Sequence, residues 1–241
     1  MNIVYSQERK IPFSDCDRNN ELHLSAYLAW AAEIAGDHLD HRNVPRSMLL
    51  EHNQVFLISK VSVHILKPVC YEDRCTLRTW ERALKGVQFI RNYSLENEAG
   101  EPCIQSAASW VLADPVSRKL LRPSEYISEQ LLHEEDVDAE ITRFKLADLP
   151  KTAEHTILLT QIDNNQHLNN RFYADMLVNY APAEFFGKSL RSAEISYVHE
   201  AYLGQTLSIH TAPIGEDSYA MYGVTEDGKR CFDAKATVLL A

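Results

Sequence analysis

The sequence predicts an α+β protein built from two copies of one domain. Three short matches recur in the same order along its 241 residues. His23-Leu24-Ser25 returns as His167-Leu168-Asn169, Val61-Ser62-Val63 as Ile195-Ser196-Tyr197, and Gly100-Glu101-Pro102-Cys103 as Gly228-Lys229-Arg230-Cys231. Each copy has a helical pattern first and strand patterns after it, which is an α+β order. The matches are 144, 134 and 128 residues apart, far beyond the roughly 20–50 residues of solenoid repeats, so the repeated unit is a whole domain.

One amphipathic helix is expected near the start of each copy. In the first copy, Ser25 is expected to cap a helix that begins near Ala26. Its apolar face repeats at helical spacing and contains Tyr27, Leu28, Ala31, Ile34, Ala35 and Leu39. In the second copy, Asn170 is expected to be the cap and the helix to end before Pro182. Its apolar face contains Phe172, Tyr173, Met176, Leu177 and Tyr180.

Strand patterns follow each helix. Apolar and polar residues alternate over 57–65 and again over 232–240, as expected for strands with one buried face. Glu98-Ala99-Gly100 and Glu226-Asp227-Gly228 are turn signals that would join neighbouring strands into hairpins. Six of the twelve residues from Glu129 to Glu140 are acidic, which indicates a solvated linker with helical potential. The expected domains are therefore 1–128 and 153–241, with an acidic linker at 129–152.

Charge and composition exclude several functions. The chain has 24 basic and 34 acidic residues, a formal net charge of −10, so neither nucleic acid nor an anionic membrane is an expected partner. No apolar stretch approaches the roughly 18 residues of a membrane span, and the first ten residues lack the core of a signal peptide. The five cysteines form no CxxC pair and no zinc-like set. We expect a reduced, cytoplasmic protein without a metal site.

The residues with catalytic potential gather just before the second helix. Asp163, Asn165 and His167 alternate, and an extended backbone would point all three to one side. The helix N-terminus that follows offers unpaired amide groups and the positive end of a dipole. Such a site could stabilise the oxyanion that forms when a carbonyl is attacked. The alternative is a polar turn with ordinary capping residues.

A comparison of the two copies favours the functional interpretation. Aligned on His23, the first copy has Asn19 at the position of Asp163 and Glu21 at the position of Asn165. Capping alone would not require the complete polar set in only one copy. His23 itself is expected to be structural.

In this segment the sequence resembles the acyl-acyl carrier protein (acyl-ACP) thioesterases, which are double hotdog proteins. The family's mark is Asp-x-Asn-x-His-x-Asn-Asn with a Tyr three residues on, and it is met here by Asp163, Asn165, His167, Asn169, Asn170 and Tyr173. A second mark is a strand that leads to a Glu, here Glu200; the Cys that follows in the plant enzymes is replaced by Ala201. The first copy also resembles the family, through Lys60-Val61-Ser62-Val63, Thr79-Trp80 and residues 107–112.

The resemblance implies a tandem hotdog, in which an antiparallel sheet wraps each central helix. It implies a hydrolase that cleaves the thioester of acyl-ACP, releases free fatty acid and ends fatty-acid synthesis, with no cofactor. The implied catalytic residues are Asp163, Asn165, His167 and Glu200, with Asn169, Asn170 and Tyr173 beside the substrate. Glu200 and His167 would act as the base, Asn165 would orient water or the carbonyl, and either water or Asp163 would attack.

The resemblance also places the acyl chain in the first copy, where the candidate lining residues are Trp30, Ile34, Leu57 and Val61; core packing is the alternative for each. No cysteine is expected to act as nucleophile. Cys103 and Cys231 lie at matching positions of the two copies, which indicates a shared role in packing.

Acyl carrier protein is acidic, so its docking on this acidic chain requires a local basic patch. The candidate patch comprises Arg171, Lys188 and Arg191. A second cluster, Arg74, Arg78, Arg82 and Lys85, is expected to be solvated surface. The sequence leaves two alternative functions open: an enzyme of the same fold class that acts on acyl-CoA, as a thioesterase or a hydratase, and a non-catalytic acyl-binding regulator. It also leaves open whether two chains pair into a homodimer. Acyl-chain length is also open.

Overall fold

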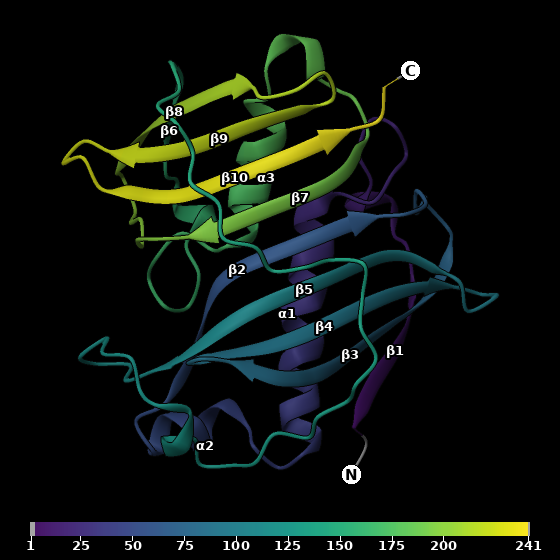
Figure 1. Cartoon of the computed structure of the whole chain (residues 1–241), viewed down its shortest axis with the longest axis vertical. Coiled ribbons are helices and arrows are strands. Elements are labelled where there is room, and N and C mark those ends of the chain that lie inside the picture. Colours follow the sequence, from purple (N-terminus) through teal and green to yellow (C-terminus); the bar gives the residue numbers. More distant parts are fainter. Residues whose placement is uncertain (1–2, 241) are drawn as a thin grey trace. The chain divides into compact units, whose positions relative to one another are not determined.

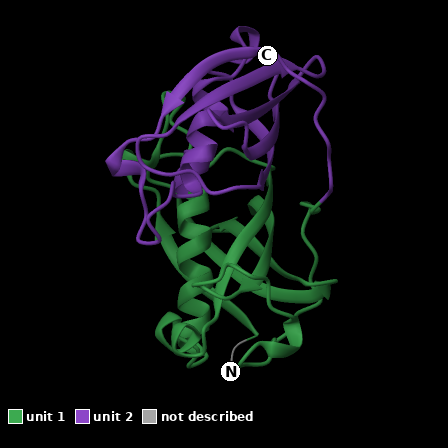
Figure 2. Ribbon diagram, turned by 90° about the vertical axis from the view of Figure 1, so that its left-hand side faces the viewer, with its two compact units in different colours: residues 1–22, 27–141 green, residues 23–26, 142–241 purple. Residues whose placement is uncertain are grey.

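The computed structural model describes residues 3–240 and divides into two compact units (Figure 2). The first unit comprises the residues up to Leu22 together with Tyr27–Ile141. The second comprises His23–Ala26 together with the residues from Thr142 onward. The division at 141/142 falls inside the segment predicted as a linker.

The first unit is a five-stranded antiparallel sheet with one long helix (Figure 1). Its strands lie in the order β1-β3-β4-β5-β2 and are β1 (Val4–Lys10), β2 (Val55–Ile65), β3 (Arg74–Lys85), β4 (Gln88–Asn97) and β5 (Pro102–Ala113). The helices are α1 (Leu24–His41) and the short α2 (Arg46–Glu51), with 3-10 turns at Phe13–Asp15 and Pro123–Glu125. The face of α1 that packs on the sheet includes Tyr27, whose hydroxyl shares a 2.7 Å hydrogen bond with Ser106 of β5.

The second unit repeats this plan with a shorter helix. Its strands lie in the order β7-β10-β9-β8-β6 and are β6 (Lys151–Thr156), β7 (Leu190–Tyr197), β8 (Thr206–Pro213), β9 (Ser218–Thr225) and β10 (Arg230–Val238). The helix is α3 (Arg171–Asn179), with 3-10 turns at Leu159–Gln161 and Ala183–Phe185. Tyr173, Met176 and Leu177 form the buried face of α3, and the Tyr219 hydroxyl donates to the Leu177 carbonyl at 2.9 Å. The predicted α+β, hotdog-like fold is confirmed.

Both helices begin differently from the prediction. α1 begins at Leu24, so Ser25 lies inside the first turn and is not its cap. Asn170 precedes α3 but already has helical torsion angles, φ −55° and ψ −28°, and makes no side-chain capping bond. A capping side chain needs an extended backbone to reach back to the free amides. Asn169 takes this role, because its Oδ1 accepts from the Arg171 amide at 3.1 Å.

The two predicted hairpins are present, and their turns have the same backbone conformation and hydrogen bond. Gly100 and Gly228 both have positive φ, 76° and 81°, a conformation that costs glycine little. The Gly100 amide donates to Asn97 and the Gly228 amide to Thr225, each at 2.9 Å. These matched turns are structural evidence for the duplication.

The acidic segment 129–140 contains no helix. Its carboxylates are largely exposed, as expected, but they pair with β3: Glu135 with Arg78 at 3.0 Å and Asp136 with Arg82 at 3.7 Å. The Trp80 indole also donates to the Glu135 carbonyl at 2.8 Å. The segment is therefore solvated, as expected, but it also lies along the first unit's own sheet and pairs with two arginines of the second basic cluster.

Candidate active site

A tight turn, not an extended strand, carries Asp163, Asn165 and His167. The Asp163 amide donates to the His167 carbonyl at 3.0 Å, and Oδ1 of Asp163 accepts from the Asn165 amide at 2.7 Å. Gln166, inside the turn, has a φ of 67°. The expected alternation of side chains on an extended backbone is therefore wrong, although the turn still brings Asp163 and His167 together.

The structure also aligns the two copies differently from the sequence matches. The Asp17 amide donates to the Glu21 carbonyl at 2.8 Å, just as Asp163 donates to His167. The first unit therefore has Asp17 at the position of Asp163 and Glu21 at the position of His167. The alignment on His23 is wrong by two residues.

His167 lies between two carboxylates. Only 8% of the residue is exposed. Its Nδ1 is 3.6 Å from Oδ1 of Asp163, and its Nε2 is 3.5 Å from Oε1 of Glu200. Nε2 has no hydrogen-bond partner among residues 3–240. Bonds of this kind are often long in an unliganded site and shorten in the reacting complex, so the imidazole is well placed to exchange a proton with Glu200.

The loop after β7 places Glu200. The Leu168 amide donates to the Ala201 carbonyl at 2.8 Å, which ties this loop to the entrance of α3. Glu200 is partly solvated, with 31% of its side chain exposed. Its other oxygen, Oε2, accepts from the Tyr202 hydroxyl at 2.8 Å. Tyr202 was not predicted, because a tyrosine two residues beyond Glu200, in the loop after β7, carries no recognisable sequence signal.

The other predicted site residues differ in exposure and in their contacts. Asn165 is exposed, and its Nδ2 is 3.4 Å from Oδ2 of Asp163. Asn169 caps α3, as described above. Tyr173 is buried, with its ring 4.9 Å from that of Phe232, and burial raises the pKa of its hydroxyl well above the usual value. Tyr173 therefore stays neutral and packs in the core of the second unit.

The predicted docking residues are all exposed in the second unit: Arg171, Lys188 and Arg191. The guanidinium of Arg171 lies 4.7 Å from the centre of the Phe172 ring, and Nζ of Lys188 lies 5.8 Å from that of Phe185. Their charges remain at the surface, so their role in docking stays a prediction.

The cysteines have the environment of packing residues. Cys103 and Cys231 are both buried, as predicted. Burial raises the pKa of the Cys231 thiol to about 11, so it stays protonated at neutral pH, whereas a nucleophilic cysteine needs its thiolate. Within residues 3–240, no group of three or more His, Cys, Asp or Glu is arranged to hold a metal ion.

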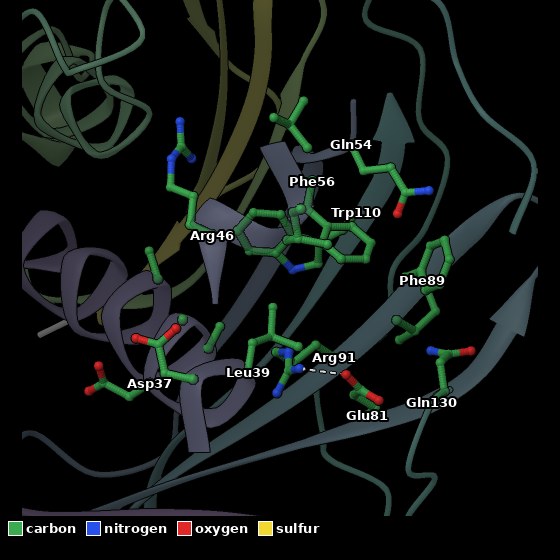
Figure 3. A pocket seen from close by; sticks show the side chains of 17 residues that line it. Asp37, Leu39, Arg46, Gln54, Phe56, Glu81, Phe89, Arg91, Trp110 and Gln130 are labelled. Atoms are coloured by element: carbon green, nitrogen blue, oxygen red, sulfur yellow. Dashed lines mark hydrogen bonds and ion pairs between the residues drawn. The ribbon is translucent and has the colours of Figure 1, made fainter. Parts of the chain in front are cut away.

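The first unit contains a cavity of about 280 Å³ between α1, α2 and the sheet (Figure 3). Its walls are largely apolar and include Leu39, Leu49, Phe56, Phe89 and Trp110. None of the four predicted lining residues contributes to it. Trp30, Ile34 and Val61 are buried core residues, so packing, the alternative for each, accounts for their positions; Leu57 is half-buried on β2.

A buried ionic cluster forms one wall of this cavity. Glu81 Oε1 accepts from Nη1 of Arg42 and from Nη2 of Arg91, both at 2.8 Å. Arg91 also lies 3.0 Å from Nδ1 of His38. All four residues are buried, and Figure 3 shows the Arg91–Glu81 pair facing the cavity. Periodicity gives no indication of this cluster, because Glu81 and Arg91 appear in sequence as ordinary strand charges.

Two family models match most of the chain. The N-terminal domain of acyl-ACP thioesterases matches residues 2–131, and the C-terminal domain matches residues 146–236. Among solved structures, the chain is similar to an acyl-ACP thioesterase from Bacteroides thetaiotaomicron, with a TM-score of 0.90 and 19% identity over 98% of each chain. It is also similar to the 12:0-ACP thioesterase from Umbellularia californica, with a TM-score of 0.81 and 14% identity over 98% of this chain and 97% of that one. At these identities the structural likeness shows the fold. No curated protein matches the sequence significantly.

The fold and the matched domains define a thioester hydrolase of hotdog-like architecture. The chain belongs to the acyl-ACP thioesterase family, and its reaction is hydrolysis of the thioester of acyl-ACP. No helix within residues 3–240 is long and apolar enough to cross a membrane.

Proposed function

We propose that the chain releases a free fatty acid from acyl carrier protein, and so ends fatty-acid synthesis, at a site formed by Asp163, Asn165, His167 and Glu200. One observation carries this assignment: His167 is buried within 3.6 Å of two carboxylates, inside the matched C-terminal domain. All five cysteines are free thiols, in keeping with a reducing compartment such as the cytoplasm.

In the proposed reaction, water attacks the thioester carbonyl carbon and its proton passes to the Glu200–His167 pair. The carbonyl oxygen becomes an anion, which the Asn165 amide and the positive end of α3 stabilise. The C–S bond then breaks. The sulfur takes up the proton and leaves as the carrier's thiol, and the acid remains. The backbone amides of Arg171, Phe172 and Tyr173 already donate to Asn169 and Asn170, so the Asn165 side chain is the better oxyanion donor.

The cavity of the first unit is the proposed site of the acyl chain, in place of the slot predicted around Trp30 and Val61. Its aromatic and aliphatic walls suit a hydrocarbon, since ligand pockets are predominantly apolar. The Arg42–Glu81–Arg91 cluster closes one side. Separating buried, paired charges costs free energy, and the methyl end of an acyl chain cannot replace their hydrogen bonds. The acyl chain would therefore end at this wall. The cluster would therefore limit chain length.

Carrier-protein docking is proposed on Arg171, Lys188 and Arg191. The observation behind it is that all three are exposed cations in the unit that carries the site, while the ion pairs Arg78–Glu135 and Arg82–Asp136 neutralise much of the competing cluster on β3.

A substrate comparison tests the proposal. The purified chain is given acyl-ACP or acyl-CoA with acyl chains of graded length, and the release of thiol and of free acid is measured. We expect a higher kcat/KM for acyl-ACP and a sharp decline beyond one chain length. Faster turnover of acyl-CoA would favour the alternative of a CoA-dependent enzyme, and binding without release would favour the regulator. Light scattering of the same sample determines whether the chain forms a homodimer.

A further inference from the structure

The loop that carries Glu200 has a structural counterpart in the first unit. There, the amides of Leu66 and Lys67 donate to the Cys103 carbonyl at 2.8 and 3.1 Å. In the second unit, the amides of Val198 and His199 donate to the Cys231 carbonyl at 2.8 and 3.2 Å. The two loops therefore leave their strands in the same way.

The match continues to the end of the loop. The Leu22 amide donates to Val69, as the Leu168 amide donates to Ala201, each at 2.8 Å. The Cys70 amide donates to Oδ2 of Asp73 at 2.8 Å, as the Tyr202 amide donates to Oε1 of Gln205 at 2.9 Å. The paired positions are therefore Pro68 with Glu200, Val69 with Ala201, and Cys70 with Tyr202.

The turn before the helix is matched in the same detail. Oδ1 of Asp17 accepts from the Asn19 amide at 2.8 Å, as Oδ1 of Asp163 accepts from the Asn165 amide at 2.7 Å. This Asp-x-Asn bond is present even in the unit that lacks the histidine. The bond itself is therefore part of the fold and does not distinguish the reactive unit.

Three polar positions do distinguish the second unit. His167 stands where the first unit has Glu21, Glu200 where it has Pro68, and Tyr202 where it has Cys70. These three side chains form one line of contacts: the Tyr202 hydroxyl donates to Oε2 of Glu200 at 2.8 Å, and Oε1 of Glu200 lies 3.5 Å from Nε2 of His167.

We propose that Tyr202 is a positioning residue, which holds one oxygen of Glu200 so that the other faces His167. The proposal rests on the function proposed above for Glu200. A carboxylate on a flexible stem has several rotamers, and fixing it in one costs conformational entropy. The phenol fixes Oε2, and the Gln205 bond fixes the backbone of Tyr202 in turn. Tyr202 itself need not touch the substrate.

The test is a double-mutant cycle on the full chain, with turnover of acyl-ACP as the readout. Tyr202→Phe removes the hydroxyl and keeps the ring. We expect kcat to fall about tenfold, in line with the loss of one hydrogen bond to a charged group, with KM and the melting temperature unchanged. In the Glu200→Gln background the same substitution should have no further effect. Tyr71→Phe is the matched control, because Tyr71 is an exposed tyrosine in the equivalent loop of the first unit, and it should keep wild-type kcat.

The cycle separates the two proposals. If Glu200→Gln retains wild-type turnover, the function proposed for Glu200 is wrong, and the role of Tyr202 with it. If Glu200→Gln is inactive but Tyr202→Phe is fully active, only the role of Tyr202 is overturned. The role of Tyr202 would also be overturned if Tyr202→Phe lowered kcat further in the Glu200→Gln background, or if it raised KM. Either result would mean that Tyr202 acts on the substrate directly.

Discussion

Nε2 of His167 lies 3.5 Å from Oε1 of Glu200, and the two residues come from segments of the second unit separated by α3 and β7. The hydrogen bond from the Leu168 amide to the Ala201 carbonyl holds these segments together, and its two residues directly follow His167 and Glu200 in the sequence. The relative position of His167 and Glu200 is therefore determined by the backbone of the fold as well as by the side chains themselves.

The first prediction separates the structural role of Asp163 from its chemical role. Asp163→Ala and Asp17→Ala remove the same turn bond in the two units, so each should lower the free energy of unfolding by about 1 kcal/mol. Only Asp163→Ala should lower kcat, by about 10–100-fold, because only Asp163 faces the imidazole. Chemical denaturation and acyl-ACP turnover are the measurements. Equal activity of the two variants would show that Asp163 serves the fold alone.

A second prediction concerns the thiols. Because burial raises the pKa of Cys231 to about 11, its thiol is almost wholly protonated at neutral pH, and the reactive thiolate forms only as the pH rises toward that value. Alkylation with iodoacetamide at pH 7.5 should therefore leave turnover largely intact. A folded variant with all five cysteines replaced should also turn over. Inactivation traced to one alkylated cysteine, with protection by substrate, would be incompatible with attack by water.

The cavity gives a third prediction. Gly36 of α1 lines it, and a Cβ added there would meet nothing within 4 Å. Gly36→Ala should stabilise the helix by about 1 kcal/mol and change the activity little. Gly36→Leu should keep the fold and fill the cavity, shifting the preferred substrate toward shorter acyl chains. Melting temperatures and chain-length profiles of both variants are the test; an unchanged profile in Gly36→Leu would place the acyl chain elsewhere.

A fourth prediction tests the docking surface. Lys188→Glu and Arg191→Glu should each raise KM for acyl-ACP several-fold, with a smaller effect for acyl-CoA, because only the carrier protein brings an acidic surface. The wild-type KM for acyl-ACP should also rise with salt, since exposed charges are screened over about 8–10 Å. Lys119→Glu, an exposed reversal in the first unit, is the control. Equal effects on both substrates, or no salt dependence, would rule this surface out.

Much of this molecule was predictable from its sequence. Period-two alternation and the Gly100 and Gly228 turns predicted strands and hairpins correctly. The sequence also singled out Asp163 and His167, which the structure brings within 3.6 Å of each other; their catalytic role stays a prediction. The correct alignment of the two copies was not predictable. The sequence comparison matched the identical His-Leu dipeptides, whereas the structure matches the backbone turns at Asp17–Glu21 and Asp163–His167. The position of the acidic segment 129–140 was also not predictable, because its charge pattern does not reveal that arginines on β3 lie beside it.

Side-chain contacts within irregular loops and between distant segments were also not predictable from the sequence. The Tyr202–Glu200 bond depends on the local course of a loop, and the Arg42–Glu81–Arg91 cluster joins a helix end to two strands. Neither has a periodic signature, since each partner alone appears as an ordinary surface residue.

The turnover of acyl-ACP by His167→Ala tests the proposed role of His167 most directly. The substitution should lower kcat by about 10²–10⁴-fold, the usual contribution of a positioned acid or base. The protein should still fold, because the turn that carries residue 167 is held by backbone hydrogen bonds that the substitution leaves in place; the melting temperature checks this. We predict a folded His167→Ala enzyme whose kcat is reduced at least a hundredfold. Retention of more than about a tenth of wild-type kcat would contradict this prediction, and would remove His167 from the mechanism.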